Sequence, residues 1–368
     1  MVPALWTGWS WQTRFSGLPE SRRYSLLNFN RDRDIPDDYP GLGKRGTALL
    51  NVFLTFDVEI WCDDWDEVDV QFPSAFARYV YGRSSKGSFA LPVTLEVLQE
   101  YGCRGTFFVE PLFACRFGMD PLVEIVRLIR RAGQDVQLHL HPEWTDEARP
   151  PILEGATTKR QHLFQYSLEE QTKLVSTGKA MIEAAGVASI CAFRAGSYAC
   201  NRATLQALER NGIRFDSSIN PARAWSGTDV SVAERGQRVI QVEGVREYPI
   251  TVFQDRPGRL RQVQIGSTSI GEMFHLLRQA HGQGRRAFVI VSHNFEMLVA
   301  GTTNPDPVVV RRFKALCRFL SENRDDFPTV IFPELPAVAD EEEPPVLTSP
   351  LWRTGLRAIE QARRRLYR

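Results

Sequence analysis

The sequence lacks the features that mark a membrane-spanning, nucleic-acid-binding or strongly charged protein. No stretch of its 368 residues approaches the ~18 consecutive apolar residues that a transmembrane helix needs. The formal net charge is only +1, so no overall field attracts nucleic acid or anionic lipid, and a charged partner would have to meet a local patch. With 43% hydrophobic and 24% charged residues, the composition is that of a globular protein with ample material for a core.

The chain also lacks paired cysteines. Its six cysteines are scattered and form no Cys-x-x-Cys pair, which argues against a zinc site made of thiolates. Their irregular spacing in a long chain favours buried free thiols over a disulfide framework. The first residues contain no basic segment followed by an apolar one, so they do not resemble a secretory signal. These absences together predict a cytoplasmic protein.

The composition along the chain predicts three segments. An irregular N-terminal arm with Trp6, Trp9 and Trp11 precedes a regular catalytic domain, and an acidic, proline-containing linker then leads to a basic amphipathic C-terminal helix; the predicted bounds are 1–47, 48–336 and 337–368. Two interpretations of the terminal helix, residues 351–368, stay open. It packs back on the core, or it contacts a partner or a membrane surface, which would place the protein at the periphery of the inner membrane.

Strand-like and helix-like segments alternate through the central domain. Apolar, β-rich runs predict strands at 49–56, 105–111, 135–141, 190–198, 213–218, 287–295 and 329–335. Helical spacing and capping residues predict helices at 120–133, 167–186, 201–212, 270–283 and 306–323. This alternation predicts an α/β fold of parallel βα units, either a barrel or an open sheet.

Two pairs of potential metal ligands follow predicted strands. Asp57 and Glu59 are two residues apart in TFDVEIW, and His139 and His141 are two apart in QLHLHPEW. On an extended backbone, each pair shares one face. Two of the six histidines beside two carboxylates indicate a site for one divalent metal ion.

Two further strand ends carry single ionisable residues. Arg194 in FRAGSY could pair with a catalytic carboxylate and hold it ionised. His293 leaves the very apolar strand of VIVSHNFEM, and its proton can move near neutral pH, which suits general acid catalysis. Both α/β barrels and open α/β sheets place their active sites at such strand ends.

Taken in order, these four motifs resemble the polysaccharide deacetylases, the NodB-homology hydrolases, over roughly residues 48–336. The resemblance implies a distorted (β/α)7 barrel that removes an N-acetyl group from a sugar with the help of a divalent metal, most often Zn²⁺, with Co²⁺, Ni²⁺ or Fe²⁺ as alternatives. The residues of the motifs resemble those of a subgroup of the family that takes part in bacterial surface-polysaccharide assembly.

The resemblance also implies a role for each motif residue. Asp57 corresponds to the catalytic base, Arg194 to the arginine that orients it, His139 to the first metal histidine and His293 to the general acid. The family usually has a second Asp where this chain has Val58, so Glu59 is expected to be the displaced ligand. The family also spaces its two histidines four apart, and here His141 is the expected second ligand, with Glu143 in reserve.

Residues beside these motifs are the predicted substrate contacts, with a backbone N–H near Tyr198 as an oxyanion donor; they are Trp61, Trp144, Tyr198 and Asn294. Two alternatives remain for the function. An amidohydrolase or deformylase would use the same cleft on a different amide. A carbohydrate-binding relative without catalysis would have lost the metal.

Overall fold

The structure, a computed structural model, describes residues 49–365 apart from 63, 86, 224–227 and 231–235. The predicted N-terminal arm and its tryptophans lie outside the described residues. No helix in the described part of the chain is long and apolar enough to cross a membrane.

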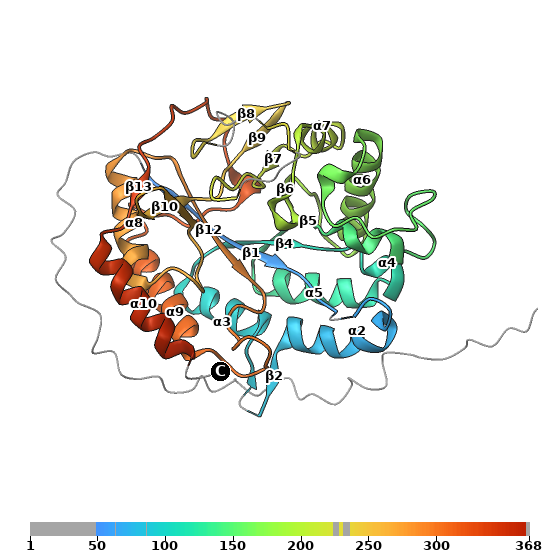
Figure 1. The fold of residues 1–368 in the computed structure, drawn as a ribbon, viewed down its shortest axis with the longest axis horizontal. Coiled ribbons are helices and arrows are strands. Elements are labelled where there is room, and N and C mark those ends of the chain that lie inside the picture. The colour runs from blue at the N-terminus through green and yellow to red at the C-terminus, as the bar shows by residue number, and fades with distance from the viewer. Residues whose placement is uncertain (1–48, 63, 86, 224–227, 231–235, 366–368) are drawn as a thin grey trace, which may run out of the picture. The chain divides into compact units, whose positions relative to one another are not determined.

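The main sheet has eight strands, of which seven run parallel and one edge strand runs antiparallel. Their spatial order is β12 (Ala287–His293), β1 (Asn51–Val58), β4 (Gly105–Val109), β5 (Asp135–Leu140), β6 (Ala192–Ala195), β7 (Phe215–Asp216), β9 (Val245–Glu247) and β8 (Ile240–Val242). The parallel order confirms the predicted βα units (Figure 1).

The sheet curls into a barrel that an irregular segment closes. After β9, the Ile250 N–H donates to the Ile219 carbonyl beyond β7, and the Thr251 N–H donates to Val289 on β12. Side chains from strands all around the barrel then meet in one apolar cluster, which includes Phe53, Phe108, Ala192, Phe215, Ile250, Val289, Val291 and Phe332. The predicted distorted barrel with seven parallel strands is therefore confirmed.

Helices flank the sheet and cover its outer face (Figure 1). They are α2 (Val68–Phe76), α3 (Leu91–Tyr101), α4 (Ala114–Phe117), α5 (Asp120–Arg131), α6 (Leu168–Ala184), α7 (Arg202–Arg210), α8 (Ile270–Gly282), α9 (Pro307–Glu322) and α10 (Leu351–Arg365). The predicted capping box of the 167–186 segment is present, because Ser167 and Glu170 each bond the other's backbone N–H. Such caps satisfy backbone donors that the first turn leaves unpaired.

Two small sheets and several short 3₁₀ or π turns complete the described elements. The sheets are β11–β10–β13 (Arg259–Gln262, Val252–Arg256, Leu347–Thr348) and β2–β3 (Arg83–Ser84, Gly87–Ser88). The turns are η1 (Ala77–Tyr81), η2 (Pro142–Glu147), η3 (Leu163–Gln165), η4 (Gly196–Tyr198) and η5 (Phe332–Glu334).

The predicted strand at 329–335 is wrong. The segment makes one isolated bridge, between Thr329 and Val52, and then turns into η5. Pro333 has no N–H to donate to a ladder, so it favours the turn over a continued strand. Phe332 nevertheless enters the core cluster, and this explains the apolar pattern that had suggested a strand.

Candidate metal and catalytic site

The carboxyl ends of β1, β5, β6 and β12 bring the predicted site residues together inside the barrel. Phe53 lies in the core cluster, and Asp57 stands on the same face of β1 at its carboxyl end. Asp57 is in register with His293 on β12, while His139 is in register with Arg194 on β6. Parallel strands end at the same edge, so residues from four separate motifs meet there.

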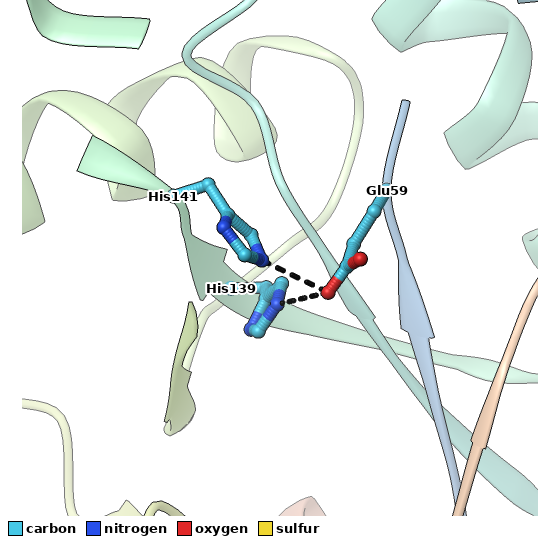
Figure 2. Close-up of side chains that lie close together, drawn as sticks. All are labelled: Glu59, His139 and His141. Carbon is cyan, nitrogen blue, oxygen red and sulfur yellow. Dashed lines mark hydrogen bonds and ion pairs between the residues drawn. The ribbon is translucent and has the colours of Figure 1, made fainter. Parts of the chain in front are cut away.

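Three ligand groups converge at this edge: Glu59, His139 and His141 (Figure 2). Glu59 Oε1 lies 3.0 Å from His139 Nε2 and 2.9 Å from His141 Nε2. All three side chains are buried. A carboxylate and two imidazoles that leave one position open form the ligand chemistry of a catalytic zinc site, so these residues fit a divalent cation.

The far sides of both imidazoles are held by acceptors. His139 Nδ1 donates to the Arg194 carbonyl at 2.7 Å, and this bond orients the ring with Nε2 toward Glu59. His141 Nδ1 lies 3.0 Å from Glu143 Oε1. Metal-binding histidines usually have such second partners, because these orient the ring and increase its basicity.

Glu143 therefore lies behind His141 and outside the group of three converging ligands. The sequence pattern allowed Glu143 as an alternative metal ligand. In the structure it is instead the partner of His141. Its Oε2 is buried and accepts no hydrogen bond within the described residues.

Burial and charge act in opposite directions on the central groups. Burial alone would raise the pKa of Glu59, but the adjacent His141, His139 and His293 hold that pKa well below its usual range. Burial alone would lower the pKa of His141, but Glu59 and Glu143 raise it well above its usual range. Glu59 is therefore an anion, poised to attract positive charge.

Asp57 forms a buried ion pair beside these ligands. Arg194 Nη1 donates to Asp57 Oδ1 at 2.7 Å, and its guanidinium lies 4.4 Å from the centre of the Phe108 ring. Arg194 Nε and Nη2 donate to the backbone carbonyl and hydroxyl of Ser217, each at 3.0 Å. With three donors satisfied, Arg194 is held in one orientation and holds Asp57 in turn.

His293 groups with Asp57 and Glu59, because one ligand atom of each residue lies within 4.8 Å of the other two. Its ring stacks on Phe295 with the centroids 5.3 Å apart, and it is only partly buried. A carboxylate and a solvent-accessible imidazole therefore flank the cluster, which is the arrangement that a general base and a general acid require.

The turn after β6 packs directly against His141. A Cβ built on Gly196 would lie 2.7 Å from the Leu140 carbonyl and 2.9 Å from the imidazole of His141, so no larger residue fits. Ser197 and Tyr198 follow with φ of 56° and 59°, a conformation that costs free energy in residues with a side chain. Such strain is common at functional sites.

The four predicted substrate contacts have different surroundings. The Trp61 indole N–H donates to Glu59 Oε2 at 2.7 Å, and its ring stands edge-on to His141 at the partly open side of the site. Tyr198 lines a pocket with Asn220 and Arg223.

Trp144 and Asn294 differ from that prediction. Trp144 is buried among Phe72, Phe113 and Phe117, so it belongs to an aromatic core. The fully buried Asn294 amide accepts from the Glu59 N–H at 3.1 Å and donates to the Glu59 and Tyr79 carbonyls. Its observed contacts position the backbone of a ligand residue.

The sequence interpretation missed Glu110, which directly follows β4 and is buried beside the site. It accepts hydrogen bonds from the Leu112 and Phe113 N–H groups. Burial raises its pKa to about 8, and the charge of Glu143 adds to the increase. A carboxyl group directly after the apolar run GTFFV is the same signal that identified Asp57, and it could have been recognised.

No protein-family model and no curated protein matches this sequence. The fold is similar to a provisionally named polysaccharide deacetylase from Mycobacterium smegmatis, with 20% identity and a TM-score of 0.47 over 78% of this chain and 88% of that one. It is also similar to a family 4 carbohydrate esterase from Streptomyces lividans, with 13% identity and a TM-score of 0.41 over 82% of this chain and 100% of that one. A third similar structure is a CE4 family pseudoenzyme from Bacillus anthracis, with 13% identity and a TM-score of 0.36 over 74% of this chain and 60% of that one. The likeness of this chain to these structures is one of fold.

Proposed function

We propose that this protein is a metal-dependent hydrolase that removes an N-acetyl group from a sugar. The observation that carries the proposal is the convergence of Glu59, His139 and His141 beside the Asp57–Arg194 ion pair and His293. Amide hydrolysis by this mechanism needs three parts. They are a metal-ligand set with an open position, a carboxylate in a fixed orientation and an accessible imidazole.

Each group has a role in the proposed reaction. Glu59, His139 and His141 would hold a divalent cation, which would supply Lewis-acid chemistry for the water and the amide carbonyl. Asp57, oriented by Arg194, takes the proton from the attacking water. The water oxygen bonds to the carbonyl carbon, the C–N bond breaks, and His293 gives a proton to the departing amine nitrogen. The products are acetate and the free amino sugar.

The substrate class rests on the resemblance of the four motifs to polysaccharide deacetylases and on the aromatic and polar groups at the open side of the site. Trp61 and Tyr198 offer ring faces of the kind that pack against sugars, and Asn220 and Arg223 line the same pocket as Tyr198. A precursor of a surface polysaccharide, processed in the cytoplasm, is the substrate we propose.

The first experiment compares the metal content of the wild-type protein with that of His139→Ala by elemental analysis. We expect about one equivalent of Zn²⁺ or another transition metal in the wild type and loss of that metal in the variant. His281→Ala removes another buried histidine, on α8, and should keep the metal. Wild-type protein that holds no metal even after reconstitution would contradict the proposed mechanism and favour a binding protein without catalysis.

A panel of N-acetyl sugars then tests the reaction itself, with acetate release as the readout. Hydrolysis of N-formyl compounds or cyclic amides, without hydrolysis of N-acetyl sugars, would keep the site chemistry and replace the substrate.

A further inference from the structure

Helix α10 is attached to the rest of the molecule through its arginines. The Arg357 guanidinium donates to Asp255 Oδ2 on β10 at 2.7 Å and to Glu272 Oε1 on α8 at 2.6 Å. Arg353 donates to the Gly271 carbonyl at 2.9 Å. Both arginines are buried. A basic helix usually turns its arginines to solvent, so this helix is inverted relative to the usual pattern.

A second group of contacts holds the C-terminal half of α10. Arg364 pairs with Asp306, the N-cap of α9, and donates to the Gly266 carbonyl at 2.8 Å. Glu360 accepts from Arg312 of α9 at 2.7 Å. Ion pairs along the helix therefore define which face of α10 points inward.

The opposite face of α10 is apolar and open. Leu351, Trp352, Leu356 and Ile359 are 68%, 59%, 57% and 54% exposed. Among residues 351–362, every exposed residue is apolar or a glycine. These residues are Leu351, Trp352, Gly355, Leu356, Ala358, Ile359 and Ala362. A soluble surface rarely carries a contiguous stripe of this kind unless something binds to it. We call these residues the apolar face of α10.

Positive charge lies beside the apolar face. The Thr354 hydroxyl donates to the Asp255 carbonyl, which joins α10 to the β10–β11 hairpin. The tip of that hairpin, residues 256–260, is exposed and contains Arg256, Arg259 and Leu260. An apolar stripe with neighbouring arginines and a tryptophan is complementary to an anionic lipid interface.

We propose that the apolar face of α10 docks on an anionic membrane surface, with Trp352, Leu356 and Ile359 inserted among the lipids and the hairpin arginines at the phosphates. The charge complementarity favours a lipid surface over a second copy of this chain, whose matching face would bring the same positive charges together. The inference is independent of the proposed reaction, because it uses none of the residues at the metal and catalytic site.

The test is flotation of the full-length protein with vesicles of phosphatidylglycerol and phosphatidylcholine, beside vesicles of phosphatidylcholine alone. The test variant combines Trp352→Ser, Leu356→Ser and Ile359→Ser, all at exposed positions. Val70→Ser on α2 is the matched control, because Val70 is 78% exposed and lies far along the chain. Circular dichroism and thermal unfolding establish that each variant is folded.

We expect the wild type and Val70→Ser to float with the anionic vesicles and the triple variant to lose that binding about tenfold or more. Arg256→Ser with Arg259→Ser should weaken binding about tenfold and reduce its dependence on salt. Equal binding by the wild type and the triple variant would overturn the proposal. Failure of the wild type to bind the anionic vesicles would also overturn it. Sedimentation velocity would then distinguish a dimer that the triple variant breaks from a monomer whose apolar face another segment covers.

Discussion

Two buried clusters of charged side chains in this protein differ in the kind of cation that faces their carboxyl groups. Beneath α10, the carboxylates of Asp255, Glu272 and Asp306 meet the guanidinium groups of Arg357 and Arg364. At the barrel edge, four buried carboxyl groups gather. Arg194 pairs there with Asp57, and an imidazole, that of His141, lies between Glu59 and Glu143. The other three carboxyl groups are Glu59, Glu110 and Glu143.

The difference separates a structural cluster from a functional one. A buried carboxylate paired with arginine has its desolvation offset and needs nothing more. A buried carboxylate without such a partner either binds a proton or attracts a cation. Glu110 takes the first course, since its pKa is raised to about 8. Glu59, an anion between two imidazoles, suits the second.

Removing the arginine of each cluster tests the comparison and should have the largest effects. We expect Arg357→Met and Arg194→Met each to lower the free energy of unfolding by about 3–5 kcal/mol, because each leaves a buried carboxylate unpaired. Urea unfolding measures this loss. Arg194→Met should also lower kcat for deacetylation by about 10²-fold or more, because Asp57 loses its orientation.

Arg357→Met is the control for activity, since it lies under α10 and touches no site residue. Equal losses of kcat in the two folded variants would contradict the division into a structural and a functional cluster.

The pH dependence of stability tests whether Glu110 is protonated. In the folded protein its pKa is about 8, against an ordinary value of 4.5, so between these values the native state holds a proton that the unfolded chain has released. The contribution of Glu110 is complete below the lower value, and the free energy of unfolding falls by about 1.4 kcal/mol per pH unit as the pH rises through the window.

The measurement is urea unfolding of the metal-free protein across that window, beside Glu110→Gln. The difference between the two slopes isolates Glu110 from the other titrating groups. Parallel curves would mean that Glu110 titrates at its ordinary value and that its burial costs less than the geometry implies.

The smallest predicted effect concerns the group behind His141. Glu143→Gln keeps the shape of the side chain but removes its charge, so His141 becomes a weaker ligand and zinc affinity should fall about tenfold. Competition with a chromophoric chelator measures the affinity. Glu147→Gln, on the same 3₁₀ turn, is the control, because Glu147 pairs with Arg116 and Lys159 rather than with a histidine. If the zinc affinity of Glu143→Gln equals that of the wild type, Glu143 has a structural role and does not strengthen His141 as a ligand.

Local patterns were enough to locate most of the fold and the chemistry. Apolar runs predicted β1, β4, β5 and β12, and the Ser167–Glu170 capping box marked the start of α6. The two-residue spacing in Asp57–Glu59 and His139–His141 indicated a shared face, and the structure places the first residue of each pair on its strand and the second directly after it. The segment at 329–335 failed because an apolar pattern records burial, whereas Pro333 decides whether a ladder can continue.

The roles of single side chains were harder to predict, because a residue beside a motif can serve it in several ways. Trp144 follows the ligand histidines, yet packs into an aromatic core. Asn294 follows the candidate acid, yet holds the backbone of Glu59. Helical periodicity marked residues 351–368 as amphipathic, but it could not say which face turns inward, since that depends on Asp255, Glu272 and Asp306 from distant segments.

The sequence by itself determined the alternation of strands and helices, the four motifs at strand ends and the kind of chemistry they can perform, because each depends on neighbours within a few residues. Only the tertiary structure decided which of these groups meet. The pairing of Arg194 with Asp57 spans 137 residues and the contact of Glu59 with His141 spans 82. Such contacts, like the outward turn of the apolar face of α10, are set by the closure of the barrel and by the balance of charges that it buries.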